Sequence, residues 1–299
     1  MQEDVKQRNR LERHSVVDIY LSGGNGRFYW PNRLQPYDES IPTVRRDCNQ
    51  YIIDSGFGEG GATTSELIDI AYERDPDYLI PNDTVNTPDV AMRDAVEETA
   101  EQVASFLDTI NEQRFPATVL VPLQPPHEFH YAYLHEHYPR QAHRAHFALG
   151  GMKFLSPAKQ VKHITRFREV AGYDAYVHGF GVGSSRTLIE ALRENPALLD
   201  SVDFSTPQHH ARSGELAGAS RVPVYVGTAK GDEWATTSGH YITAELCDIA
   251  RMLAPSLTDD SDIAINWEKL GKTPPSDGEQ TDSPETDHPE TATLGDFSP

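Results

Sequence analysis

Six short apolar runs in the sequence end in, or are followed directly by, a polar residue or a glycine. These residues are Asp54-Ser55-Gly56, Asn82-Asp83, Gln124, Gly150-Gly151, His178-Gly179 and Asp203. A single aspartate in such a position is usually a helix cap or a turn residue and carries little weight. Six groups in the same place relative to an apolar run are harder to explain as turns. They predict one pocket lined by three carboxylates, one amide and a pair of glycines.

This set of side chains suits chemistry at a glycosidic carbon. One carboxylate can attack or stabilise an oxocarbenium-like centre, while another moves a proton on the leaving group. An amide and the backbone N–H groups beside a glycine can hydrogen-bond the edge of a planar polar ring. A nucleotide-cofactor enzyme is not favoured, because the closely spaced glycines at 178–184 lack the G-x-G-x-x-G spacing.

A barrel of alternating strands and helices would place these residues together. The apolar runs are β-branched or aromatic and bounded by Gly, Pro or Asp, as buried parallel strands are: 16–21, 51–54, 77–81, 118–124, 146–151, 174–180, 201–204 and 222–227. The clearest helical segments between them are 63–74, 88–113, 156–171 and 184–194. This order predicts an α/β fold, a (β/α)8 TIM barrel, in which active-site residues lie at the carboxyl ends of the strands. A doubly wound open sheet would account for six of the strands about as well.

The composition divides the chain into three parts. We expect an N-terminal extension at 1–15, a single barrel domain at 16–258 and an acidic, largely disordered tail at 259–299. The apolar runs are too short to span a membrane, and the N-terminus lacks the apolar segment of a secretory signal. Cys48 and Cys247 are the only cysteines in the sequence, which argues against a disulfide scaffold and against a Cys-rich zinc site.

Six short motifs, taken in order, resemble those of the tRNA-guanine transglycosylases and of their DNA-modifying relatives (the DpdA type), which exchange guanine for a 7-deazaguanine. The motifs are IIDSGFG (52–58), DYLIPND (77–83), LVPLQ (120–124), ALGGMK (148–153), VHGFGVGS (177–184) and SVDFSTPQHHARSG (201–214). Each motif is short and degenerate, whereas the ordered set is specific. The resemblance implies base exchange through a covalent aspartyl-glycosyl intermediate.

The resemblance also implies a role for each polar residue of the pocket. Asp203 matches the nucleophile that attacks C1′ of the target nucleoside, and Asp54 matches the general acid/base. Asp83 matches the carboxylate that binds the pyrimidine edge of the purine. Gln124 and one backbone N–H of the glycine pair match the groups that bind its six-position oxygen. The complete set of predicted base-binding residues is Asp83, Gln124, Gly150, Gly151, Ser55 and Gly56. The residue types alone do not say which aspartate is the nucleophile.

The sequence departs from the tRNA enzymes in two ways. Their CxCxxC…H zinc site is missing after the nucleophile, where His209 and His210 alone cannot replace four ligands. The chain also has no room for their C-terminal RNA-binding domains. We therefore expect no zinc and no other cofactor, and we expect DNA as the substrate, with a free 7-deazaguanine base (preQ0 or preQ1) as the incoming base.

Other interpretations stay open at this point. The same exchange on tRNA is the first alternative, a non-catalytic partner subunit of a transglycosylase is the second, and an unrelated barrel hydrolase acting on a sugar is the third. A homodimer or a helper protein is also compatible with the family. No membrane partner is expected.

The charge of the chain is strongly acidic. Its 46 acidic residues outnumber the 26 basic ones, for a formal net charge of −20, and only 7 of the basic residues are lysines. This composition is typical of a high-salt cytoplasm, so we predict a cytoplasmic protein of a halophilic archaeon or of one of its viruses. An ordinary acidic mesophilic protein is the alternative. By charge alone, nucleic acid would be an unlikely partner.

One segment runs against the acidic composition. Residues 140–168 contain no Asp or Glu but hold Arg140, Arg144, Lys153, Lys159, Lys162, Arg166 and Arg168. Because the segment surrounds the glycine pair, we expect a phosphate backbone to lie there, although basic helix faces on an acidic protein would look alike. The predicted nucleic-acid contacts are Arg144, Lys153, Lys159, Lys162 and Arg212.

Two further groups are compatible with more than one role. Residues 26–33 (GRFYWPNR), in the first loop after a strand, could stack on a base or plug one end of the barrel. Six histidines fall within 20 residues: His127, His130, His135, His137, His143 and His146. Their spacing matches no recognised zinc signature, so we interpret them as solvated or phosphate-contacting.

Overall fold

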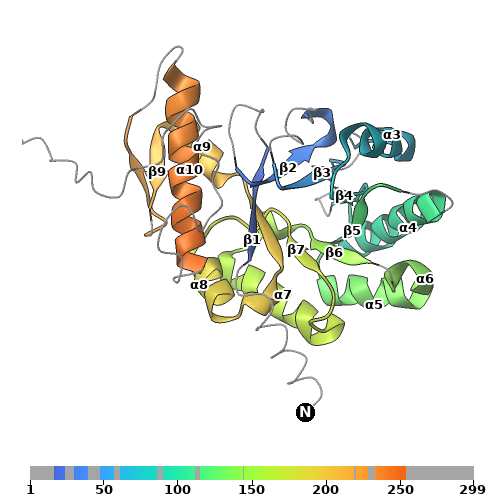
Figure 1. The fold of residues 1–299 in the computed structure, drawn as a ribbon. Coiled ribbons are helices and arrows are strands. Elements are labelled where there is room, and N and C mark those ends of the chain that lie inside the picture. Colours follow the sequence, from blue (N-terminus) through green and yellow to red (C-terminus); the bar gives the residue numbers. More distant parts are fainter. Residues whose placement is uncertain are drawn as a thin grey trace, which may run out of the picture.

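The computed structural model describes residues 17–23, 30–39, 48–56, 61–85, 90–111, 115–143, 145–218, 220–227 and 233–253. Eight parallel strands close into a barrel in sequence order, and the last strand pairs with the first (Figure 1). The (β/α)8 barrel predicted from the sequence is therefore confirmed. The N-terminal extension at 1–15 and the acidic tail at 259–299 lie outside the described residues.

Helices follow the strands around the outside of the barrel (Figure 1). The barrel strands are β1 (Asp18–Ser22), β2 (Asn32–Pro36), β3 (Gln50–Asp54), β4 (Tyr78–Ile80), β5 (Thr118–Leu123), β6 (His146–Leu149), β7 (Val177–Gly179) and β8 (Ser201–Phe204). The helices are α3 (Thr64–Arg74), α4 (Met92–Asn111), α5 (His127–His137), α6 (Pro139–Ala142), α7 (Pro157–Ala171), α8 (Arg186–Glu194), α9 (Thr206–Ser213) and α10 (Glu233–Leu253). Short 3-10 turns lie at η1 (Tyr37–Glu39), η3 (Met152–Phe154) and η4 (Pro196–Leu198).

Side chains on the strands point alternately to the two faces of the barrel wall and so belong to two hydrophobic cores. Side chains such as Leu79, Val121 and Phe147 belong to the main cluster, which includes the apolar faces of the helices. A smaller cluster fills the barrel itself: Tyr20, Leu34, Ile52, Ile80, Leu120 and Ala148. Because side chains on a strand alternate with a period of two, Asp54 points the same way as Ile52, into the barrel, one layer closer to its carboxyl end.

One of the eight predicted barrel strands is wrong, and one barrel strand is missing from the prediction. Residues 222–227 contain β10 (Pro223–Tyr225), which pairs antiparallel with β9 (Glu215–Ala217) in a separate two-stranded sheet and is exposed along its length. The missing strand is β2, whose sequence NRLQP has no apolar run. Arg33 and Gln35 are nevertheless buried, because Arg33 donates to the Gly23 carbonyl at 3.1 Å and Gln35 accepts from the Tyr51 hydroxyl at 2.9 Å.

Part of the segment at 26–33 belongs to the core and to β2. Trp30 is buried, and its indole N–H donates to the Ile19 carbonyl at 2.9 Å, so this ring belongs to the core and not to a surface that could stack on a base. Arg33 lies within β2 itself. Residues 27–29 lie outside the described residues.

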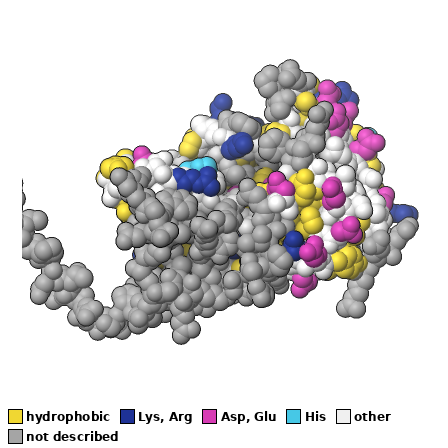
Figure 2. Space-filling model, turned by 90° about the horizontal axis from the view of Figure 1, so that it is seen from above, with side chains coloured by type: hydrophobic (Ala, Val, Ile, Leu, Met, Phe, Trp, Pro, Cys, Tyr) yellow, Lys and Arg dark blue, Asp and Glu magenta, His cyan; other side chains and the backbone are white. Residues whose placement is uncertain are grey.

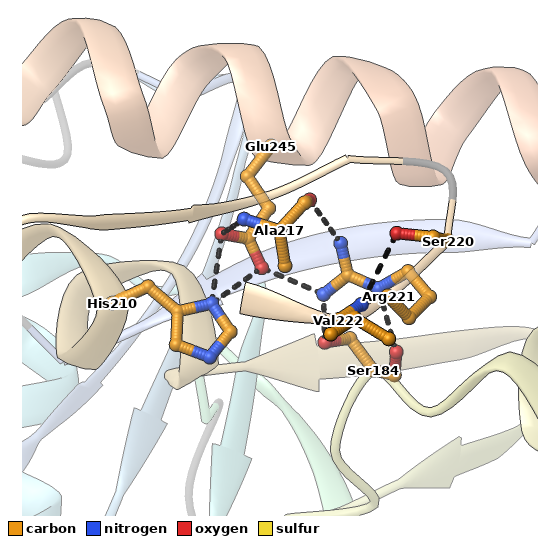
Figure 3. Close-up of polar contacts among 7 residues, drawn as sticks. All are labelled: Ser184, His210, Ala217, Ser220, Arg221, Val222 and Glu245. Atoms are coloured by element: carbon orange, nitrogen blue, oxygen red, sulfur yellow. Dashed lines mark hydrogen bonds and ion pairs between the residues drawn. The ribbon is translucent and has the colours of Figure 1, made fainter. Parts of the chain in front are cut away.

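A buried ion pair joins the β9–β10 hairpin to the barrel (Figure 3). The Arg221 guanidinium lies 2.6 Å from one carboxylate oxygen of Glu245 on α10, and it donates at 2.8 Å to the carbonyls of Ala217 and Ser184. His210 of α9 lies 3.0 Å from the other Glu245 oxygen. The side chains of Arg221 and Glu245 are 4% and 1% exposed. The Glu245 carboxylate of α10 therefore joins α9 and the β9–β10 hairpin at one point.

We expect Arg221→Met to destabilise the fold by about 3 kcal/mol, because it leaves the buried carboxylate of Glu245 without its main partner. Chemical denaturation at neutral pH measures this loss. The control Arg186→Met removes an exposed ion pair on α8 and should leave the free energy of unfolding unchanged. Equal stability of the two variants would contradict the prediction.

Candidate active site

Three carboxylates converge at the carboxyl ends of the strands. Asp54 ends β3, Asp83 follows β4 and Asp203 lies in β8. Burial raises the pKa of Asp54 to about 7, and the negative charges of Asp83 and, more weakly, Asp203 contribute to the rise. Both charges act on Asp54, so the three side chains lie close together at this end of the barrel. A carboxyl group that titrates near neutrality can both give and take a proton at physiological pH.

Asp83 and Gln124 form a buried pair within this pocket. The Gln124 Nε2 group donates to Asp83 Oδ2 at 2.5 Å. Burial raises the pKa of Asp83 to about 6, although this hydrogen bond opposes the rise. The Gln124 Oε1 atom is buried and has no hydrogen-bond partner among the described residues. Buried acceptors normally have a partner, so the amide suits a ligand that carries a donor on its edge.

Gly150 and Gly151 place main chain without side chains beside Asp83 and Gln124. A Cβ on Gly150 would lie 3.3 Å from Gln124 Nε2 and 3.8 Å from Asp83 Oδ2, so a side chain would occupy the space next to both groups. Gly151 has a φ of +67°, and a Cβ there would lie 2.8 Å from Pro125 Cδ. Only glycine fits the second position without strain, and the pair lets a planar ligand approach the main chain.

Asp203 is held by one of its two oxygens. Asp203 Oδ1 accepts from the Gly181 N–H at 2.7 Å and lies 3.5 Å from His178 Nε2. The other ring nitrogen of His178 lies 2.8 Å from the Ser201 hydroxyl oxygen, which fixes the ring beneath the carboxylate. No described residue donates to Asp203 Oδ2, which leaves this oxygen as the one that can attack a carbon. The sequence pattern does not identify Gly181 as a partner of Asp203.

Ser55 and Gly56 shape the loop around Asp54. The Gly56 N–H donates to Asp54 Oδ1 at 3.3 Å, and the buried Ser55 hydroxyl donates to the Gly56 carbonyl at 3.0 Å. Both residues thus lie at the pocket, and their binding of a base stays a prediction. Asn82 does not join it, because its side-chain amide donates to the Ala62 carbonyl and lines a separate cleft between α3 and α4.

The predicted nucleic-acid contacts are mostly exposed. Lys153 lies in η3, directly after the glycine pair, and Lys159 and Lys162 lie on the first turns of α7. Arg212 is exposed on α9, and Arg144 lies outside the described residues. Figure 2 shows one face of the molecule, on which acidic side chains gather mainly at one side, apart from a smaller group of lysine and arginine side chains.

Arg168 does not belong to an exposed basic strip. Its side chain is fully buried, where it pairs with Asp200 at 3.0 Å and donates to the carbonyls of Leu198 and Ala175 at 2.9 and 2.8 Å. Its hydrogen bonds tie α7 to the segments that precede β7 and β8. The interpretation of Arg168 as part of a phosphate-binding surface is therefore wrong.

The histidine-rich segment is divided by the fold. His137 and His143 are exposed, and His135 and His146 are partly buried. His127 and His130 are fully buried in the first turn of α5, so their interpretation as solvated or phosphate-contacting residues is wrong. Within the described ranges, no group of three or more His, Cys, Asp or Glu side chains is arranged to hold a metal ion.

Two further findings bear on the class of protein. Across the part of the chain that the structure describes, no helix combines the length and the apolar character that a membrane span needs. No model of a known protein family matches the chain, and no curated protein matches it either.

We expect Asp83→Asn to lower the pKa of Asp54 from about 7, because the substitution removes the negative charge that contributes most to the rise while the burial of Asp54 remains. The pKa should stay above the ordinary value of 3.8, since burial is the larger cause. NMR titration of the labelled carboxyl carbons measures it. Asp69→Asn, on the exposed face of α3, is the control, and an Asp54 pKa that is equal in both variants would refute the shared pocket.

Proposed function

We propose that this protein is a guanine transglycosylase that exchanges guanine in DNA for a free 7-deazaguanine, preQ0 or preQ1. The observation that carries the proposal is the convergence of three carboxylates with Gln124 and a bare glycine backbone at the mouth of the barrel. These are the groups on which the resemblance to the transglycosylases rests. Their arrangement supports a site that holds a planar base beside a nucleophile.

Asp203 is the proposed nucleophile. Its Oδ2 attacks C1′ of the target nucleoside, the bond from C1′ to N9 breaks, and guanine leaves with the bonding electrons and a proton from Asp54. The incoming base then gives its N9 proton to Asp54 and attacks C1′, which releases the Asp203 carboxylate. Each step exchanges one bond at C1′ for another, so the reaction needs no oxidant, reductant or nucleotide.

The pKa of Asp54 supports this assignment. At a pKa of about 7, the protonated and ionised forms are both present near neutral pH. The protonated form is needed to release guanine, and the ionised form is needed to accept the proton of the incoming base. Asp203 is anchored through Oδ1 by a backbone N–H, which holds the carboxylate in place while Oδ2 attacks.

Asp83 and Gln124 are the proposed base-reading groups. Asp83 accepts from the donors on the pyrimidine edge of guanine, which every guanine-like base in the exchange shares. The Gln124 Nε2 group has two N–H bonds, one of which is used by Asp83, so the second can donate to the six-position oxygen. Both bases of the exchange therefore fit the same contacts.

DNA is proposed over tRNA because the residues that follow the proposed nucleophile lack the CxCxxC…H zinc motif of the tRNA enzymes. The target guanine must leave the stack, at a cost of a few kcal/mol. Exposed lysines on η3 and α7 supply cationic contacts near the glycine pair. In the high-salt cytoplasm proposed for this acidic protein, counterion release contributes little, so the pocket must supply more of the affinity. A non-catalytic partner subunit would not need all three carboxylates.

We expect Asp203→Asn to abolish incorporation of a radiolabelled 7-deazaguanine into DNA, because the amide cannot form the glycosyl ester. Denatured gels should show a covalent adduct between the wild-type protein and DNA, which the variant lacks. Asp69→Asn is the matched control and should incorporate the label at the wild-type rate. Full incorporation by Asp203→Asn would disprove the proposal.

The nucleic acid is tested with two double variants assayed on duplex DNA and on unmodified tRNA. Lys159→Gln/Lys162→Gln should raise KM for DNA several-fold and leave KM for the free base unchanged, because the lysines contact phosphate only. Arg93→Gln/Arg193→Gln removes two exposed charges on α4 and α8, outside the basic segment 140–168, and should have no effect. Exchange on tRNA but not on DNA would favour the tRNA alternative.

A further inference from the structure

Two histidines of α5 hydrogen-bond the backbone of the proposed base-binding groups. The Gln124 N–H donates to His130 Nδ1 at 2.8 Å, and His127 Nε2 lies 2.9 Å from the Gly150 carbonyl oxygen. The two histidines are three residues apart in the first turn of the helix and therefore share one face. Both side chains are 0% exposed. One short segment thus contacts the loops after β5 and β6 at once.

The partners fix the proton on each ring. His130 Nδ1 accepts from an amide N–H, so this nitrogen carries no proton and the neutral ring is protonated at Nε2. A carbonyl oxygen can only accept, so His127 must donate from Nε2. Burial lowers the pKa of His127 to about 4 and that of His130 to about 3, which keeps both rings neutral at physiological pH. Metal binding is not supported, because no described metal-binding group includes them.

The contact with Gly150 orients the next peptide group. A trans peptide is planar, and its C=O and N–H point in opposite directions. When His127 holds the Gly150 carbonyl, the N–H of Gly151 must point away from His127. The Gly150 N–H is already used, because it donates to the Leu123 carbonyl at 2.9 Å. Of the glycine pair, Gly151 is therefore the residue whose N–H can serve a ligand.

The contact with Gln124 acts on the other base-reading group. His130 holds the backbone N–H of Gln124, and Asp83 holds its side-chain amide, so the residue is fixed at both ends. His127 and His130 thus restrain two groups from two different loops. Preorganised donors of this kind bind best when the scaffold leaves them little freedom to move.

We propose that His127 and His130 are positioning residues that set the Gly151 N–H and the Gln124 amide to bind the six-position oxygen of the purine base. This inference rests on the proposed function. It makes a neutral histidine pair part of base specificity, although neither ring touches the base.

The test compares variants that lose each histidine hydrogen bond with variants that keep it through a different side chain. His127→Phe and His130→Phe remove the donor and the acceptor, whereas His127→Gln keeps a donor at the ε position and His130→Asn keeps an acceptor at the δ position. His137→Phe, at the exposed end of α5, is the control. Steady-state kinetics give KM for the free base and for DNA separately, and thermal unfolding reports the folded fraction of each variant.

We expect both Phe variants to raise KM for the base about tenfold or more, with KM for DNA within about twofold of wild type. The Gln and Asn variants should recover most of the lost affinity. Folded Phe variants with an unchanged KM for the base would overturn the proposal. A loss that affects base and DNA equally, or that the conservative variants do not repair, would also overturn it, because it would mark a purely structural role.

Nitrogen NMR of labelled histidine separates this inference from the proposed function. The wild-type spectrum should show His127 and His130 as neutral rings protonated at Nε2, and equilibrium dialysis should show binding of guanine that both Phe variants weaken. If wild-type protein neither exchanges nor binds guanine, the proposed function fails, and the positioning role fails with it. If guanine is exchanged but either ring is an imidazolium at neutral pH, the positioning role alone is wrong.

Discussion

Three like-charged side chains can share a buried pocket only if protonation, hydrogen bonds or a bound ligand relieves their repulsion. In this barrel the relief differs for each acid. Asp54 titrates near neutrality, Asp83 accepts from a buried amide, and Asp203 accepts from a backbone N–H. Chemically identical side chains are thereby given three different tasks. Under the proposed function, this separation allows one carboxylate to attack while another transfers a proton.

Neutral groups pack against the loops that carry Gln124 and the glycine pair. The rings of His127 and His130 are uncharged because they are buried, and they hydrogen-bond main-chain groups of Gly150 and Gln124. Glycine at 150 and 151 keeps side chains away from the same space.

The acidity of the whole chain has little bearing on this site. Ion pairs that matter for the fold lie elsewhere and are buried, as between Arg221 and Glu245 or between Arg168 and Asp200. Exposed cations on α7 and η3 lie near the loops of the pocket, where a nucleic-acid backbone would pass under the proposed function. Net charge therefore does not describe the local distribution of charge around this site.

The sequence by itself determined the barrel and the polar residues at its carboxyl ends, because apolar periodicity and strand-end positions are local patterns. It failed for β2, whose polar residues are buried by partners elsewhere in the chain, as when Gln35 accepts from Tyr51. It also failed for residues 222–227, where a β-branched run forms an exposed hairpin strand. Only the tertiary structure decided that Arg168 is buried, that two histidines hydrogen-bond the loops after β5 and β6, and that burial raises the pKa of Asp54 to about 7. Each of these properties depends on groups that the fold brings together from distant segments, and no local pattern records them.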